Sequence, residues 1–230
     1  ADTATVTVAG LSGGAATDLT LANVETVALT ASGTTNDFDL IAEAAKTLTI
    51  AGTGEITLPN LDTADTDSLT SIDASSNSGA VTITTGQQDT GSTTDLSVTG
   101  GSGNDTIDVT AHTNSDVSVT GGAGNDTIKT ALASTDTIAG GDGTDTLETS
   151  ANITSGNITG IEKVTLTGNV TQDMDAFDGN TITTLQIDST GTTGFTDVSS
   201  DVTTFVLDNA SGTATSLDRK TDGSSDSLTI

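Results

Sequence analysis

One stretch of sequence occurs three times in the middle of the chain. Thr94–Thr110 (TDLSVTGGSGNDTIDVT) is nearly repeated by Ser115–Thr130 (SDVSVTGGAGNDTIKT), and a third copy, TDTIAGGDGTDTLET, occupies Thr135–Thr149. Tandem self-similarity with a period of about 20 residues is typical of solenoids, in which each coil buries its apolar face only against neighbouring coils. The repeat therefore predicts a stack of similar coils in this part of the chain.

Each copy contains the nine-residue pattern G-G-x-G-x-D-x-U-x, in which U is a large apolar residue. The three matches are Gly100–Asp108, Gly121–Lys129 and Gly140–Glu148. Glycines allow the backbone to fold back sharply and to aim its carbonyls at one point, which a Cβ would block. The apolar residues of the pattern, Ile107, Ile128 and Leu147, are expected to point inward and to form a narrow core.

The pattern also predicts a calcium site. Calcium is a hard cation that takes about six to eight oxygen ligands, and loop carbonyls with an aspartate supply them. The aspartates Asp105, Asp126 and Asp145 are separated by 21 and 19 residues. In a coil of two nonapeptides every second turn falls on the same edge, so the three loops should form one column with neighbours about 4.8 Å apart. Three loops leave two gaps, and we expect about two calcium ions there.

The opposite edge of the predicted roll is less regular. Ala131–Ala139 (ALASTDTIA) keeps only the aspartate, Asp136, and the apolar positions of the pattern. Asp95, Asp116 and Asp136 each precede a Gly-Gly pair and could form a second acidic column. The alternative to calcium loops is a set of ordinary Gly-Asn-Asp hairpin turns, but three complete copies at near-constant spacing argue against it.

Composition narrows the function. The chain has 32 acidic and 5 basic side chains and a net charge of −27, which excludes a general nucleic-acid binder. Either the chain is disordered and acidic, or its carboxylates bind cations; the 32% apolar content, placed in short alternating runs, favours the second. There is no cysteine, so metal ions are the expected substitute for disulfides in a secreted protein. No apolar run is long enough for membrane insertion.

The fold class predicted is all-β: a parallel β-roll or β-solenoid with calcium turns in the centre, flanked by β-rich regions that are solenoid or sandwich-like. Short Thr- and Val-rich runs between Gly, Asn, Asp and Ser indicate strands of about four to six residues. The best helical pattern, Leu40–Lys46 (LIAEAAK), covers only about two turns. We divide the chain into an N-terminal β region (1–93), a central roll (94–150) and a C-terminal β region (151–230), and its strand-like ends indicate a fragment of a longer protein.

The loops resemble those of RTX (repeats-in-toxin) proteins, the secreted calcium-dependent proteins of Gram-negative bacteria. The order VETVALT, SLTSIDASSNSGAVTITT, GGSGNDTI, GGDGTDTLE, GIEKVTLTG and TLQIDSTGTTGFTDV is similar to the C-terminal part of RTX-type S-layer proteins of the Caulobacter kind. The resemblance implies that loop aspartates and loop carbonyls bind Ca²⁺. The implied ligand residues are Gly101, Ser102, Gly103, Asn104, Asp105, Gly122, Ala123, Gly124, Asn125, Asp126, Gly141, Asp142, Gly143 and Asp145. Asp136, on the less regular opposite edge, is a further possible ligand.

An enzyme is not expected. His112 is the only histidine, there is no Trp or Tyr to line a sugar cleft, and the Thr-x-Thr pairs are too irregular for an ice-binding array. The leading interpretation is a secreted structural component of a bacterial surface layer, in which calcium folds the protomer and supports self-assembly into a lattice. A cell-surface polysaccharide could be bound through parts outside this fragment. The alternatives are a domain of a large RTX adhesin, or a non-catalytic RTX module of a secreted enzyme or toxin.

Acidic segments outside the repeats are the places where calcium could bridge two protomers. Asp62–Asp67 (DTADTD) and Asp222–Asp226 (DGSSD) are the two candidates, and the alternative is that both are solvated loops.

Overall fold

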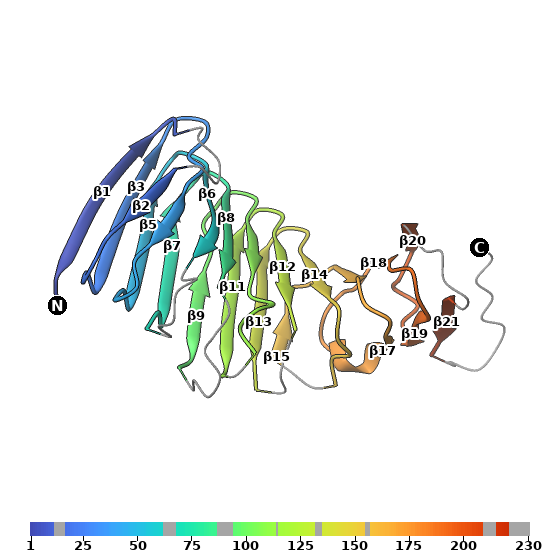
Figure 1. The fold of residues 1–230 in the computed structure, drawn as a ribbon. Helices are drawn as coiled ribbons and strands as arrows, with labels where there is room; N and C mark the ends of the chain where they lie inside the picture. The colour runs from blue at the N-terminus through green and yellow to red at the C-terminus, as the bar shows by residue number, and fades with distance from the viewer. Residues whose placement is uncertain are drawn as a thin grey trace.

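The chain folds as one continuous β-solenoid, in which parallel strands of successive coils stack along a single axis (Figure 1). The structure is a computed structural model that describes residues 1–11, 17–61, 68–86, 94–113, 115–131, 135–154, 157–208 and 215–220. Within these residues, the pairs of neighbouring strands are parallel, as coils of a solenoid require. The all-β, parallel-solenoid prediction is confirmed.

Two long sheets form the opposite walls of the solenoid. The first, called here the odd sheet, contains β1 (Thr3–Ala9), β3 (Thr26–Ser32), β5 (Thr47–Gly52), β7 (Ser71–Asn77), β9 (Leu96–Thr99), β11 (Val117–Ala123), β13 (Thr137–Asp142) and β15 (Asn157–Thr159). The second, the even sheet, contains β6 (Ile56–Leu61), β8 (Val81–Thr85), β10 (Thr106–Asp108), β12 (Thr127–Thr130), β14 (Thr146–Thr149), β16 (Lys163–Leu166), β18 (Thr184–Asp188) and β20 (Thr204–Asp208).

Two smaller sheets occupy the ends. At the N-terminal end, β2 (Asp18–Thr20) pairs with β4 (Asp39–Ile41), and a bridge from Asp37 to Thr57 places this pair beside β6. At the C-terminal end, β17 (Thr171–Asp173), β19 (Thr193–Val198) and β21 (Thr215–Arg219) form a three-stranded sheet.

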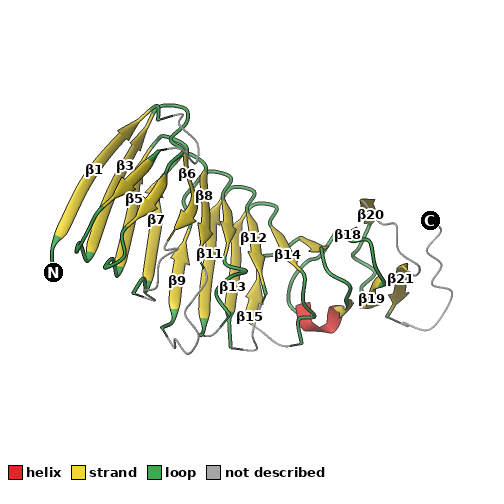
Figure 2. Ribbon diagram, viewed as in Figure 1, coloured by secondary structure: helices red, strands yellow, loops and turns green. Residues whose placement is uncertain are grey.

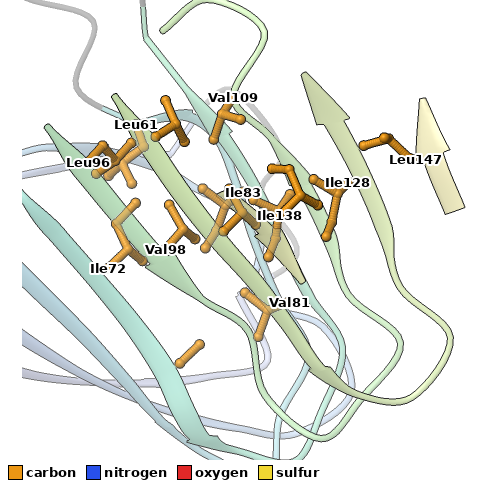
Figure 3. Packing of buried hydrophobic residues seen from close by; sticks show 14 of the residues in the cluster. Leu61, Ile72, Val81, Ile83, Leu96, Val98, Val109, Ile128, Ile138 and Leu147 are labelled. Atoms are coloured by element: carbon orange, nitrogen blue, oxygen red, sulfur yellow. The ribbon is translucent and has the colours of Figure 1, made fainter. Parts of the chain in front are cut away.

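The core is a thin layer between the two long sheets (Figure 3). Most strands of the two long sheets alternate buried and exposed residues, so each contributes one to three apolar side chains to this layer. Ile107, Ile128 and Leu147 are in register on neighbouring strands and are fully buried, which confirms the inward direction predicted for them. Burial of each such side chain stabilises the fold by about 1.5–3 kcal/mol.

The sheets continue across the limits of the central roll. β7 pairs with β9 across position 93, and β14 pairs with β16 across position 150. The flanking regions are therefore coils of the same solenoid, and the division of the chain at positions 93 and 150 remains a prediction from sequence motifs.

The helical pattern at Leu40–Lys46 does not produce a helix. Leu40 and Ile41 end β4, and the chain then turns with the Ala45 N–H donating to the Ala42 carbonyl at 2.9 Å. Two turns are too short to nucleate a stable helix, and burial of Leu40 between coils decides the outcome. The described residues contain a short 3-10 helix, Met174–Phe177, and no helix long and apolar enough to cross a membrane.

Candidate cation site at the glycine-rich edge

The three Gly-rich loops lie on one edge of the solenoid, where odd strands pass to even strands (Figure 2). We call Gly100–Asp105, Gly121–Asp126 and Gly140–Asp145 the loop column. The strands that leave the loops are aligned, since Thr127 pairs with Thr106 and with Thr146. The predicted stacking of the loops on one edge is therefore confirmed, despite the unequal spacing of the repeats.

The aspartates of the loop column are buried and linked coil to coil. Asp105, Asp126 and Asp145 are at most 1% exposed. The Asp105 N–H donates to Asp126 Oδ1 at 2.8 Å, and the Asp126 N–H donates to Asp145 Oδ1 at 2.8 Å. Asp105 Oδ1 accepts in the same way from the Val81 N–H at 2.8 Å. One oxygen of each carboxylate thus holds the preceding coil in place.

The second oxygens of these three carboxylates, the Oδ2 atoms, differ in whether they have a hydrogen-bond donor. Asp105 Oδ2 accepts from the Gly101 N–H at 2.6 Å. Asp126 Oδ2 and Asp145 Oδ2 are buried and have no hydrogen-bond partner. The glycines that correspond to Gly101 are Gly122 and Gly141, which have φ of +120° and +116° and lie within strands, so their backbones follow a different course. Two buried carboxylate oxygens therefore lack the partner that buried polar atoms normally have, a place that a proton or a bound cation can fill.

Burial also changes the acidity of the column. Burial raises the pKa of Asp126 to about 7; the Asp105 N–H acts against this, and the charges of Asp105 and Asp145 add to it. Burial raises the pKa of Asp105 and of Asp145 as well. Three stacked carboxylates in a desolvated position are costly as anions, and a bound divalent cation would reverse that cost.

Carbonyl oxygens approach the carboxylates at the first glycine of each loop. A Cβ on Gly121 would overlap both Asp126 Oδ2 and the carbonyl oxygen of Gly140 in the next coil. A Cβ on Gly100 would likewise overlap Asp105 Oδ2 and the Gly121 carbonyl oxygen. At each step a carboxylate oxygen and a carbonyl oxygen of the following coil face the same point. Oxygens of both kinds are the ligand types that calcium prefers, so these residues fit part of a calcium shell of about six to eight oxygens.

The other predicted ligand residues shape the outer turn. Asn104 Oδ1 accepts from the Asn125 N–H at 2.8 Å, and Asn125 Oδ1 accepts from the Thr144 N–H at 2.9 Å. These two side chains already bind the next loop and form a second ladder outside the aspartates. The Gly101 carbonyl accepts from the Ala123 N–H at 3.0 Å, and the Asp142 carbonyl accepts from the Gly124 N–H at 2.8 Å.

Close stacking explains the remaining glycines. A Cβ on Gly103, Gly124 or Gly143 would overlap backbone atoms of the preceding coil. Ser102 is exposed at the tip of the first loop, and its N–H donates to the Asn77 carbonyl at 3.0 Å. These residues thus keep the loops in contact, which brings the carbonyls and the aspartates together.

The acidic residues of the opposite edge do not align as one column. Asp95 and Asp116 are exposed and neighbouring, with the Asp116 N–H donating to Asp95 Oδ1 at 3.2 Å. Asp136 is buried, and its Oδ1 accepts from the Val117 N–H at 2.8 Å. Because Thr137 pairs with Ser118, Asp136 is in register with Val117 and not with Asp116. Shortening of the third repeat moves Asp136 by one position.

Glu162 was not predicted from the sequence, yet it joins the loop column. The Asp145 N–H donates to Glu162 Oε2 at 2.8 Å, so Glu162 continues the ladder of carboxylates by one coil. Glu162 follows Asp145 by 17 residues, and its local sequence, GIEKV, lacks the Gly-rich pattern. The spacing was the only sequence signal. Within the described residues, the loop column included, no three His, Cys, Asp or Glu side chains gather as a metal-binding group, so any cation there would rely on carbonyl oxygens as well.

His112 lies in the loop after β10. Its Nε2 is 3.0 Å from Ser115 Oγ, whose hydroxyl donates to the Thr94 carbonyl. The ring therefore takes part in a local loop contact.

Comparisons with protein-family models, with curated proteins and with solved structures found no match.

Proposed function

We propose that the chain is a calcium-binding structural solenoid of a secreted bacterial protein, and that it serves in a surface layer. The observation that carries the proposal is the pair of buried, unpartnered oxygens, Asp126 Oδ2 and Asp145 Oδ2, on glycine-built loops. Calcium bound there would join adjacent coils and offset the repulsion among stacked carboxylates. The cation would act as a structural clamp between coils.

Self-association is supported by the distribution of charge. The strands of the odd sheet contain two charged residues, Asp73 and Asp142, whereas the even sheet presents Asp108, Lys129 and Glu148 side by side. One outer row of the odd sheet is in register along its length and carries hydroxyls until its last member: Thr3, Thr26, Thr47, Ser71, Ser97, Ser118, Thr137 and Asn157. In a chain of net charge −27, copies repel least across this face.

The extracellular, lattice-forming role is tested by electron microscopy. Protein in calcium is compared with protein in sodium at equal ionic strength, because screening alone weakens repulsion without linking chains. We expect ordered two-dimensional arrays in calcium and none in sodium. The acidic segments 62–67 and 222–226, proposed as bridges, lie outside the described residues.

A variant pair identifies the face. Ser118→Glu places a charge on the exposed row of the odd sheet, and Thr204→Glu places one on the exposed edge strand of the even sheet. We expect Ser118→Glu to abolish arrays and Thr204→Glu to retain them. Equal arrays in sodium and calcium, or a monomer that binds a surface glycan in calcium, would favour the adhesin interpretation instead.

A further inference from the structure

The loop column has a step beyond its last Gly-rich motif. There the Gly140–Asp145 loop meets the turn Gly160–Glu162, which belongs to the next coil. Because Thr146 pairs with Lys163, Glu162 is in register with Asp145. The turn has no Gly-rich pattern, so nothing in its sequence marks it as a cation site.

The contacts at this step repeat those between the motif loops. A Cβ on Gly140 would overlap Asp145 Oδ2 and the Gly160 carbonyl oxygen, just as a Cβ on Gly121 would overlap the corresponding pair of oxygens. Gly160 has a φ of +63°, a conformation that favours glycine.

The strongest sign of a missing partner lies at the same step. Asp145 is fully buried, and its Oδ2 has no hydrogen-bond partner. It faces the Gly160 turn, while Oδ1 of the same carboxylate is bound to the Asp126 N–H of the preceding coil. The half-buried Glu162 brings a second carboxylate to this point, held by the Asp145 N–H. Asp145 Oδ2 and the Gly160 carbonyl oxygen thus approach the same glycine, and Glu162 adds a second carboxylate at the register position of Asp145 on the following coil.

We propose that Glu162 completes a third calcium site, formed by Asp145, Glu162 and the Gly160 carbonyl, which closes the C-terminal end of the loop column. The proposal rests on the proposed function, since it assumes that the column binds calcium. In this arrangement each loop aspartate binds the calcium ion that lies between its own coil and the coil that follows. Three loops therefore hold three calcium ions, the third between the Gly140–Asp145 loop and the Gly160–Glu162 turn. The sequence pattern alone counts two, because it does not include Glu162.

The test is a count of bound calcium by native mass spectrometry, with affinities from titration calorimetry. Glu162→Gln removes the charge but keeps an oxygen that can accept from the Asp145 N–H, so the fold should be retained. The matched control is Glu55→Gln, an exposed acid on the same edge beside β6. We expect Glu162→Gln to bind one calcium fewer than the wild type, and Glu55→Gln to bind the wild-type number.

The outcomes separate the two proposals. Equal stoichiometry and affinity in Glu162→Gln and the wild type would overturn the third site while leaving the motif sites intact. A wild type that binds no calcium would overturn the proposed function itself. Circular dichroism without calcium serves as the folding control: Glu162→Gln should melt at or above the wild-type temperature, because it removes one charge facing Asp145. A lower melting temperature together with an unchanged calcium count would assign Glu162 a purely structural role.

Discussion

Replacement of Asp126 by asparagine should stabilise the calcium-free protein at alkaline pH. Asparagine keeps the Oδ1 that accepts from the Asp105 N–H, and it removes the buried charge whose second oxygen has no partner. The pKa of Asp126 is raised from 3.8 to about 7 by burial. Three pKa units correspond to at most about 4 kcal/mol of unfolding free energy between the protonated and the ionised column.

The direction of the pH dependence of stability follows from the raised pKa of Asp126. A group that holds its proton more tightly when folded contributes stability that is fully present below its unfolded pKa of 3.8 and is lost as pH rises through about 7. The calcium-free wild type should therefore weaken from pH 4 to pH 8. Asp126→Asn should show a shallower loss, with the remainder due to Asp105 and Asp145, whose pKa values burial also raises.

The measurement is urea denaturation in calcium-free buffer from pH 4 to pH 8, followed by far-ultraviolet circular dichroism. Asp126→Asn should exceed the wild type at pH 8 and match it at pH 4, and the order at pH 8 should reverse in millimolar calcium. Asp95→Asn, an exposed acid on the opposite edge, is the control and should follow the wild type throughout. An Asp126→Asn protein that is weaker than the wild type at every pH without calcium would show that burial does not strain this carboxylate.

Three further substitutions test the packing. Ile128→Ala, at a fully buried position between Ile107 and Leu147, should cost about 2–5 kcal/mol in urea denaturation with calcium present. A loss below 1 kcal/mol would mean that the thin core is not close-packed there. Gly179→Ala, at a φ of +97° with open space around it, should cost about 1–2 kcal/mol from backbone strain alone. Gly141→Ala should cost more and should also weaken calcium binding, because its Cβ would overlap the Gly122 carbonyl oxygen; equal losses in the two alanine variants would contradict this close approach.

The repeats were enough to predict the architecture of the centre. Identical spacing of Gly and Asp within each copy fixes the turn, and the apolar position two residues after each aspartate fixes the inward direction of Ile107, Ile128 and Leu147. Because the turn and the inward residue are set locally, unequal repeat lengths did not prevent the loops from stacking.

What the sequence did not reveal depends on long-range register. Glu162 lies in the loop column because β16 pairs with β14, and the sequence of its own turn does not reveal this pairing. Asp136 leaves its expected column because the third repeat is shorter, which shifts its register by one residue. Leu40 has neighbours typical of a helix, yet it is buried in β4 beside Leu19 of β2. In each case a partner on another coil decides the position.

The most direct test of calcium binding at the loop column is thermal melting with and without calcium, which does not depend on any assembly. It compares the wild type with a triple variant that carries Asp105→Asn, Asp126→Asn and Asp145→Asn. In a strong chelator at pH 8 the wild type should melt at a lower temperature and lose part of its β circular-dichroism signal, and millimolar calcium should restore both. The triple variant should keep its β signal in chelator and gain nothing from calcium. A wild-type spectrum and melting temperature unchanged by chelator, or an equal rise with calcium in both proteins, would contradict calcium binding at the loop column.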